Sequence, residues 1–414
     1  MSSLQLEDPK IEALVQKEAR RLEETLDLIA AENHSPPAIM EALGSVFNTK
    51  TIEGYPGRRY HAGCVNADAV ERLAISRAKT LFKAEHANVQ PHSGTSANLG
   101  VYFSVLDIGD KILSMTLSHG GHLSHGHPVS IAGKCFKIRH YGVDRKSGLI
   151  DYRELMSLAK TFRPKMIVAG ASSYPRLIDY EKIAAAAASI QAYFMVDMAH
   201  IGGLVAAGVI PSPVPAAHFV TLTCYKTMMG GRGGIILCRK RFAKQIDTSV
   251  FPGCQGTSAV NSIAAKAVIL KMAKGKPFVA IQKKTIDTAR TLSEQFINKG
   301  YRVVTNGTDT HQVIIDVASR GADAGLVEKA LEKSNIVLNR NLLPGDERKP
   351  GTTSGIRIGT AAMTARGMGP AEAGIVADLM DRVITHVNRP DVILAVKKEI
   401  VLLCRRFPVY KVPV

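Results

Sequence analysis

The chain has 414 residues, 46% of them hydrophobic and 21% charged, which is enough for a large core and roughly two or three domains. Its formal net charge is +17, but lysine and arginine are spread along the whole length without a basic block interleaved with aromatics. Nucleic-acid binding is therefore not favoured, and a positive field that attracts anionic substrates explains the charge.

Targeting and redox signals are absent from the sequence pattern. No apolar stretch reaches the length of a membrane span, and no basic segment followed by an apolar core marks a secretory signal. The six cysteines show neither metal nor disulfide spacing, which favours a reducing compartment. We therefore expect a cytoplasmic globular protein with no membrane association.

The periodicity of apolar residues changes twice along the chain. Residues 7–30 carry leucines and charges at helical spacing, which predicts an amphipathic helix or arm. Strand and helix patterns then alternate to about residue 275, as is typical of a mostly parallel sheet covered by helices. A long helix toward Gly300 and a strand at 311–316 follow. We expect an N-terminal helical arm (1–30), a large α/β cofactor-binding domain (31–275) and a smaller α+β C-terminal domain (276–414).

A run of small residues follows the first predicted strand of the large domain. Ser93-Gly94-Thr95 comes shortly after the segment 87–90 and would open a helix. Backbone N–H groups at a helix N-terminus can bind a phosphate. A simple N-cap explains the same residues, so the pattern is weak by itself.

Asp197 ends a buried strand predicted at 192–196. An acid at the carboxyl end of a parallel strand points into the crevice where α/β folds bind ligands. A pyridoxal phosphate enzyme needs such a carboxylate against the pyridine nitrogen, and His200 could reach the phenolic oxygen of the cofactor. A lone aspartate at a strand end is more often only a cap.

Lys226 ends the apolar run 219–225 and precedes the glycine-rich segment 230–234. A lysine between two buried strands is costly unless its charge is removed or paired, and a Schiff base with an aldehyde cofactor removes it. The alternative is a lysine that snorkels to water. We interpret the glycines as a turn between strands, although a phosphate cradle has the same composition.

Six segments match one family in order: Leu28–Asn33, Glu53–Tyr60, His119–Gly126, Val196–His200, Phe251–Gly256 and Ser354–Thr360. Through them the chain resembles serine hydroxymethyltransferase along nearly its whole length. The resemblance implies a fold-type I pyridoxal phosphate enzyme that uses an amino acid and tetrahydrofolate. It also implies a homodimer or tetramer whose active sites are shared between subunits.

The resemblance implies cofactor roles for individual residues. Lys226 would hold the cofactor as a Schiff base, Asp197 would pair with the ring nitrogen, and His122 would stack on the ring. His200 and Ser172 would lie beside the ring. The phosphate would be bound by Ser93, Gly94 and Thr95, together with the partner subunit's backbone around Gly256 and Thr257.

The same resemblance implies contacts to both substrates. Arg357 would bind the amino acid carboxylate bidentately, and Glu53 from the partner subunit would handle a proton. Without the resemblance, both would most often be solvated charges. Tyr225 would act beside Lys226. The remaining contacts would be Thr51, Tyr60 and His61 on the amino acid side, and Leu117, Gly121, Leu123 and Asn341 on the folate side.

Three histidines at spacing three, His119, His122 and His125, raise the question of a metal site. The segment is rich in glycine and has no carboxylate or cysteine immediately beside it, so we expect no metal there.

Six positions depart from the family pattern near the expected site. Tyr225 stands in place of a histidine, Thr51 and His61 in place of tyrosines, Ala31 of a serine, Thr257 of a glycine, and Gly351 of an aromatic residue. Loss of the ring at position 51 would open space beside the substrate.

We therefore expect reversible hydroxymethyl transfer between tetrahydrofolate and either serine or an α-substituted serine such as 2-methylserine, giving glycine or alanine. The substitutions leave open a folate-independent aldolase or transaldolase acting on β-hydroxy amino acids. An inactive homologue that binds nucleic acid through its basic surface is the alternative outside enzymes.

Overall fold

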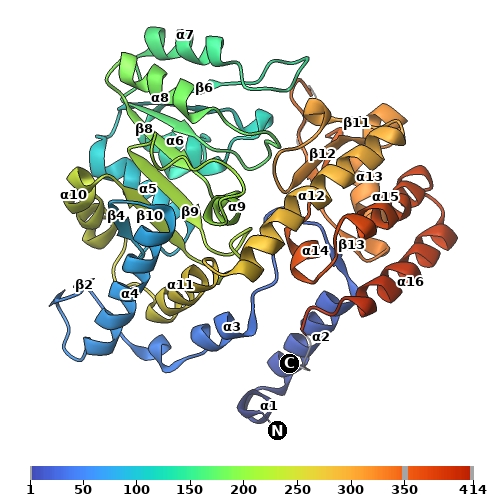
Figure 1. The fold of residues 1–414 in the computed structure, drawn as a ribbon, viewed down its shortest axis with the longest axis horizontal. Helices are drawn as coiled ribbons and strands as arrows, with labels where there is room; N and C mark the ends of the chain where they lie inside the picture. Colours follow the sequence, from blue (N-terminus) through green and yellow to red (C-terminus); the bar gives the residue numbers. More distant parts are fainter. Residues whose placement is uncertain (1, 347–352, 411–414) are drawn as a thin grey trace. The chain divides into compact units, whose positions relative to one another are not determined.

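The structure is a computed structural model that describes residues 2–346 and 353–410. The described chain forms two compact units (Figure 1). Among the described residues, unit 1 comprises 2–34, 284–342 and 353–410, and unit 2 comprises 35–283 and 343–346. The division differs from the predicted domains, because the N-terminal residues cluster with the C-terminal ones and the main boundary falls after Lys283.

The predicted N-terminal helix is confirmed, as α2 (Pro9–Glu24) preceded by the short α1 (Ser3–Glu7). The Asp8 carboxylate accepts from the backbone N–H groups of Lys10 and Ile11, and Pro9 occupies the first helical position, where its missing N–H costs nothing. None of the residues of α2 is buried.

Unit 1 is built on a four-stranded antiparallel sheet in the order β11-β12-β15-β14. The strand β12 confirms the strand predicted at 311–316, and the long helix α12 confirms the helix predicted before it. Leu292, Phe296, Ile315, Ile358 and Met380 belong to its core. The strands are β1 (Leu26–Asp27), β11 (Arg302–Val303), β12 (Gln312–Asp316), β13 (Ile336–Val337), β14 (Asn339–Asn341) and β15 (Gly355–Gly359). The helices are α12 (Lys276–Asn298), which begins in unit 2, α13 (Ala324–Lys333), α14 (Ala361–Ala365), α15 (Pro370–Thr385) and α16 (Pro390–Arg406).

Unit 2 contains a seven-stranded sheet in the order β4-β10-β9-β8-β7-β5-β6. Neighbouring strands are parallel except for the two pairs that involve β10, so the predicted mostly parallel sheet is confirmed. Its central strands are buried on both faces, which is why they appear as continuous apolar runs. The bounds are β4 (His86–Asn88), β5 (Lys111–Met115), β6 (Lys137–Tyr141), β7 (Met166–Ala169), β8 (Tyr193–Asp197), β9 (Phe219–Thr223) and β10 (Gly234–Cys238).

Helices cover the sheet of unit 2, and a small hairpin of β2 (Gly54–Tyr55) and β3 (Arg58–Arg59) precedes α4. The helices are α3 (Pro37–Leu43), α4 (Val65–Phe82), α5 (Gly94–Val105), α6 (Ile131–Cys135), α7 (Tyr152–Phe162), α8 (Tyr180–Ser189), α9 (Gly202–Ala206), α10 (Ala243–Thr248) and α11 (Val260–Met272).

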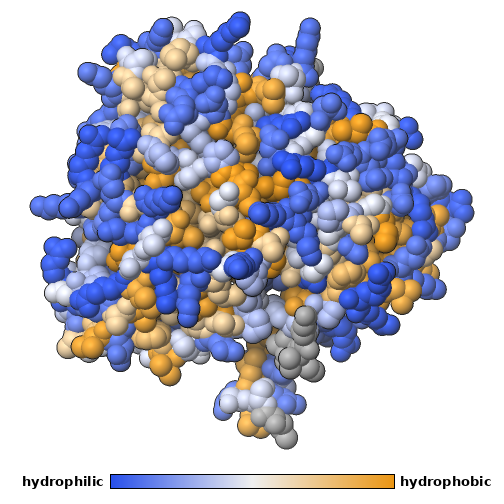
Figure 2. All heavy atoms as spheres, viewed as in Figure 1, coloured by the Kyte–Doolittle hydropathy of each residue, from blue (hydrophilic) through white to orange (hydrophobic). Residues whose placement is uncertain are grey.

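Figure 2 shows hydrophilic side chains over much of the visible face, as the dispersed charge of the sequence leads one to expect. Among the described residues, no helix has the length and apolar character to cross a bilayer.

Candidate active site

A pocket of unit 2 lies where the parallel strands β7, β8 and β9 end at their carboxyl termini. Nine of the residues singled out in the sequence line it together: Ser93, Gly94, Thr95, His122, Ser172, Asp197, His200, Tyr225 and Lys226. Four further residues complete its lining: His125, Ala171, Ala199 and Thr223. The fold therefore collects in one cavity side chains from segments more than 100 positions apart.

Lys226 lies in the turn between β9 and β10 and is only 6% exposed. Backbone hydrogen bonds close this turn, from Gly230 N to Cys224 O (2.6 Å) and from Cys224 N to Gly233 O (3.1 Å). A Cβ on Gly230 would lie 2.7 Å from the Cys224 carbonyl oxygen, so the turn needs glycine there. The glycine-rich segment is thus the predicted turn, and it holds a buried amine at the pocket wall.

Asp197, the last residue of β8, is held by three hydrogen bonds. Its Oδ2 accepts from His125 Nε2 at 3.0 Å and from Asn98 Nδ2 at 2.8 Å, and its Oδ1 accepts from Ala199 N at 2.9 Å. Burial acts to raise the pKa of Asp197, but the hydrogen bond and charge of His125 outweigh it and hold that pKa well below its usual range. The carboxylate is therefore ionised at neutral pH.

His122 contributes a neutral ring to the pocket. Its burial, followed by the charge of His125, lowers the pKa of His122 to about 4. Ser124 fixes the ring, because its backbone N–H donates to His122 Nδ1 at 3.2 Å and its hydroxyl lies 2.7 Å from the same atom. An uncharged, oriented imidazole is suited to stacking on a flat aromatic ligand.

The fold brings a carboxylate from a distant segment to two of the three histidines. Donor atoms of His122, His125 and Asp197 all lie within 4.8 Å of one another. His119 does not join them, since its Nδ1 accepts from Val143 N at 3.1 Å. The hydrogen bonds to Asp197 and His122 account for this cluster without an ion, so the absence of a metal stays a prediction.

The predicted start of a helix at Ser93–Thr95 is confirmed, with Ser93 as the N-cap of α5, while the phosphate site stays a prediction. A capping box joins Ser93 and Ser96, with Ser96 N donating to Ser93 Oγ at 3.1 Å and Ser93 N to Ser96 Oγ at 2.8 Å. Gly94 and Thr95 occupy the first turn, where backbone N–H groups have no acceptor within the helix. A Cβ on Gly94 would lie 2.7 Å from Thr223 Cγ2, so only glycine allows this close approach. The arrangement suits an anion at the positive end of the helix.

The chemistry of these groups fits pyridoxal phosphate. The cofactor needs an amine for its aldehyde, an anion for its ring nitrogen and a site for its phosphate. Lys226, Asp197 and the N-terminus of α5 offer those three groups in one pocket, and His122 offers a neutral ring.

Six other predicted residues of unit 2 lie outside the pocket lining, although Thr257 O is 3.2 Å from His92 Nε2 beside Ser93: Thr51, Glu53, Tyr60, His61, Gly256 and Thr257. In the part of the chain that the structure describes, none of them lines the pocket. Glu53 Oε1 lies 3.9 Å from the position that a Cβ on Gly256 would take, and the Tyr60 ring packs against Phe251 with centroids 5.8 Å apart. Tyr60 is nevertheless 77% exposed. The segments around Glu53 and Gly256 therefore lie side by side.

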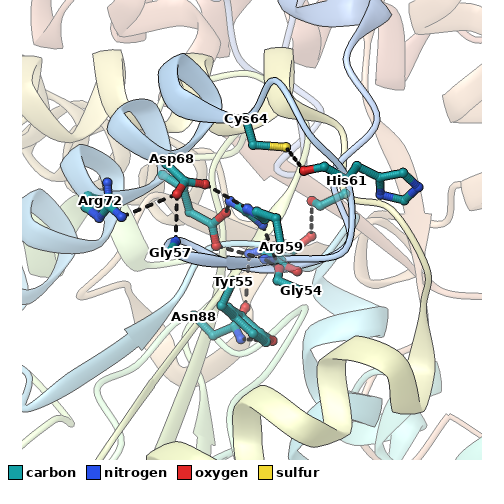
Figure 3. A network of polar contacts seen from close by, with 12 residues as sticks. Gly54, Tyr55, Gly57, Arg59, His61, Cys64, Asp68, Arg72 and Asn88 are labelled. Atoms are coloured by element: carbon teal, nitrogen blue, oxygen red, sulfur yellow. Dashed lines mark hydrogen bonds and ion pairs between the residues drawn. The ribbon is translucent and has the colours of Figure 1, made fainter.

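Arg59 fixes the hairpin that follows Glu53 onto α4 (Figure 3). Its guanidinium donates to Asp68 Oδ1 at 2.8 Å, to Glu71 Oε2 at 2.5 Å and to the Gly54 carbonyl oxygen at 2.6 Å. Gln90 Nε2 adds bonds to the Gly54 carbonyl oxygen and to Glu71 Oε1. Because the Arg59 and Glu71 side chains are both buried, losing Arg59 would leave the Glu71 carboxylate without a counter-charge, whereas Arg59 also pairs with Asp68. The hairpin is thus rigidly held.

Two predicted residues belong to unit 1. Arg357, in β15, donates from Nε and Nη2 to Asn339 Oδ1 at 3.2 and 3.1 Å. Burial lowers the pKa of Arg357 to about 10, so it remains cationic at neutral pH. Asn341, at the end of β14, donates from its side chain to the Leu342 carbonyl oxygen. Gly351 lies outside the described residues.

The residues of unit 2 that were predicted to contact folate flank His122 in sequence. Leu117 and Leu123 begin two short 3-10 turns and are exposed. Gly121 is buried, and a Cβ there would lie 2.2 Å from the Met115 carbonyl oxygen, so no other residue fits. Sequence reasoning had not assigned roles to His125 and Asn98, which hold Asp197. Both are polar residues in otherwise buried segments that start with pocket residues. This polar character was the one hint of their role in the sequence.

Two comparisons with known proteins point to the same family. Residues 4–380 match the family model described as serine hydroxymethyltransferase. Two curated relatives, both named serine hydroxymethyltransferase, come from the CBDB1 and BAV1 strains of Dehalococcoides mccartyi. Each is 48% identical over 410 residues, covering 99% of this chain and 99% of the relative.

Proposed function

The chain belongs to the serine hydroxymethyltransferase family of transferases, and we propose that it moves a hydroxymethyl group between tetrahydrofolate and serine or 2-methylserine. Glycine or alanine would be the amino acid product. The observation that carries the proposal is that an enclosed amine, an ionised carboxylate and a helix N-terminus meet in one pocket of a chain from this family.

The pocket residues would hold pyridoxal phosphate, which enzymes of this family use together with tetrahydrofolate. When bound, this cofactor supplies an electron sink for the charge left when the Cα–Cβ bond breaks. Lys226 Nζ would bind the aldehyde, and the N-terminus of α5 would bind the phosphate. Asp197, kept ionised by His125 and Asn98, would hold a proton on the ring nitrogen. His122 would exclude water from one face of the ring.

A partner subunit would complete the site. Glu53 and Gly256 lie side by side, but neither lines the pocket of its own chain, which supports their use in the pocket of a second copy. Glu53 would there accept or deliver the proton of the substrate hydroxyl. Arg357 would bind the substrate carboxylate through its guanidinium. The expected homodimer or tetramer follows from this division of roles.

Thr51 and His61, which are both exposed, support the preference for an α-substituted serine, since both stand where the family pattern has larger aromatic side chains. We expect kcat/KM for 2-methylserine to equal or exceed that for serine, because the missing ring leaves room for a methyl group. In Thr51→Tyr the ratio should move toward serine by about tenfold or more, the usual value of one methyl group in a fitted pocket. Steady-state rates with serine and with 2-methylserine, each with and without tetrahydrofolate, measure this ratio.

The control for this experiment is Thr51→Ser, which keeps a small side chain and should keep the wild-type ratio. A wild-type enzyme that strongly prefers serine would contradict the α-substituted substrate.

A folate-independent aldolase is the second candidate. Tyr225 favours it, because this residue lines the pocket in place of a histidine and has the Arg232 guanidinium 4.7 Å from the centre of its ring. Rates that tetrahydrofolate does not stimulate would support it instead.

A further inference from the structure

Lys266, in α11, is a buried lysine that the proposed reaction does not use. It is 1% exposed, and its Nζ donates to the carbonyl oxygens of Val89 at 2.6 Å and Pro91 at 2.9 Å. Both acceptors that the structure gives it are backbone carbonyls. Burying an ammonium group is costly without a counter-charge, so a site that retains one has a use for it or compensates it elsewhere.

The two carbonyls belong to the segment that leads into the N-terminus of α5. Between them, the Gln90 carbonyl oxygen accepts from Ser258 Oγ at 2.7 Å and from Gln255 Nε2 at 2.9 Å. The Pro91 carbonyl oxygen also accepts from Gly234 N at 3.0 Å. Three consecutive carbonyls are thus fixed, and Lys266 binds two of them. Fixing these carbonyls also constrains the position of Ser93, because only His92 separates Ser93 from Pro91.

The stem of Lys266 also packs against the turn that carries Lys226. Gly233 has a φ of +148°, and a Cβ there would lie 2.3 Å from Lys266 Cε. The Gly233 carbonyl oxygen accepts from Cys224 N, two residues before Lys226. At the next residue, a Cβ on Gly234 would lie 2.3 Å from the Ser93 carbonyl oxygen. One side chain therefore contacts both loops that form the pocket.

Burial disfavours the charged form of Lys266. Burial lowers the pKa of Lys266 to about 8, against the smaller opposing effects of Cys224 and Glu71. Glu71 itself is engaged by Arg59 and Gln90. A phosphate at the N-terminus of α5 would add negative charge beside the segment that Lys266 holds, and would thereby favour its protonated form.

We propose that Lys266 is a positioning residue that holds the segment Pro91–Thr95 against the Lys226 turn, and so makes the pocket selective for a ligand with a phosphate group. The inference rests on the proposed function, because it concerns the phosphate of pyridoxal phosphate. It assigns Lys266 no contact with the ligand. Its effect acts through the backbone of the phosphate-binding residues and through its buried charge.

The test compares two ligands that differ only in the phosphate group. Dissociation constants of pyridoxal phosphate and of pyridoxal are measured on cofactor-free wild type and Lys266→Met, by titrating the visible absorption of the Lys226 imine. We expect the variant to bind pyridoxal phosphate about tenfold more weakly or worse, with pyridoxal affinity changed no more than about threefold. Lys271→Met, on the exposed side of α11, is the matched control and should change neither constant.

Each outcome decides the question. Equal weakening of both ligands would indicate a merely structural lysine and overturn the proposal, as would unchanged binding of pyridoxal phosphate. If Lys266→Met is recovered only as aggregate, Lys266→Gln, which keeps a donor without the charge, is judged by the same ratio. Failure of wild type itself to form an imine with pyridoxal phosphate would refute the proposed function instead, so the two failures are distinguishable.

Discussion

Asp197→Asn is expected to lower kcat for serine and tetrahydrofolate by about 10²–10³-fold, the usual cost of removing one preorganised electrostatic group from an active site. The amide matches the carboxylate in shape but carries no charge. It can no longer hold a proton on a ring nitrogen. Its NH₂ group must also face a donor, either His125 Nε2 and Asn98 Nδ2 or the Ala199 N–H. Steady-state kinetics at saturating cofactor measure the effect.

Asp107→Asn is the control for this prediction, because the Asp107 side chain is 94% exposed and should tolerate the change without loss of activity. The unfolding midpoint of both variants is measured in urea, so that a folding defect is separated from a chemical one. Asp197→Asn retaining more than about a tenth of the wild-type kcat would show that the ring charge is not what this carboxylate supplies.

Mixing two inactive variants is expected to restore activity. Lys226→Ala should lose all turnover, and Glu53→Gln should lose at least about a hundredfold, the lower range for a general acid or base. If Glu53 serves the partner's pocket, a dimer with one chain of each kind has one intact site. Random exchange of equal amounts should therefore give about a quarter of the wild-type activity.

Coexpression with two different tags isolates the mixed dimers, and mass spectrometry verifies their composition. Each variant alone, carried through the same purification, is the control. Verified mixed dimers without recovered activity would place the function of Glu53 in its own chain, or outside the reaction, and would remove the main support for a shared site.

The sequence predicted the parts of the fold that local physics determines. The strands β7, β8, β9 and β10 are buried on both faces or nearly so, and their apolar runs identify them directly. Asp197 and Lys226 could be predicted to meet because parallel strands present their carboxyl ends at one edge of a sheet. The strand β6 was not predicted, since it is a polar edge strand without a buried run.

Long-range pairing explains why the predicted domains differ from the observed units. The strand β1 pairs with β13, more than 300 residues later, which ties the N-terminal residues to unit 1. Arg366 strengthens this by donating to the carbonyl oxygens of Glu23, Thr25 and Cys404. An isolated arginine in the sequence gives no sign that its guanidinium will join three chain segments.

The hydrogen bonds that hold Asp197 in the pocket could not be predicted from the sequence either. His125, Asn98 and Asp197 come from three separated segments, so no local spacing shows that two of them hold the third. The same remoteness concealed the carboxylate beside the histidine cluster. Lys266 looked like one more charge of a basic chain, because only the fold shows that it is buried.

Borohydride reduction of the purified protein, followed by peptide mass spectrometry, tests most directly whether the amine in the turn after β9 binds a pyridoxal cofactor. We predict that reduction abolishes a visible absorption band and leaves one pyridoxyl group per chain, on Lys226. A protein without such a band, or a pyridoxyl group found on a different lysine, would contradict the account.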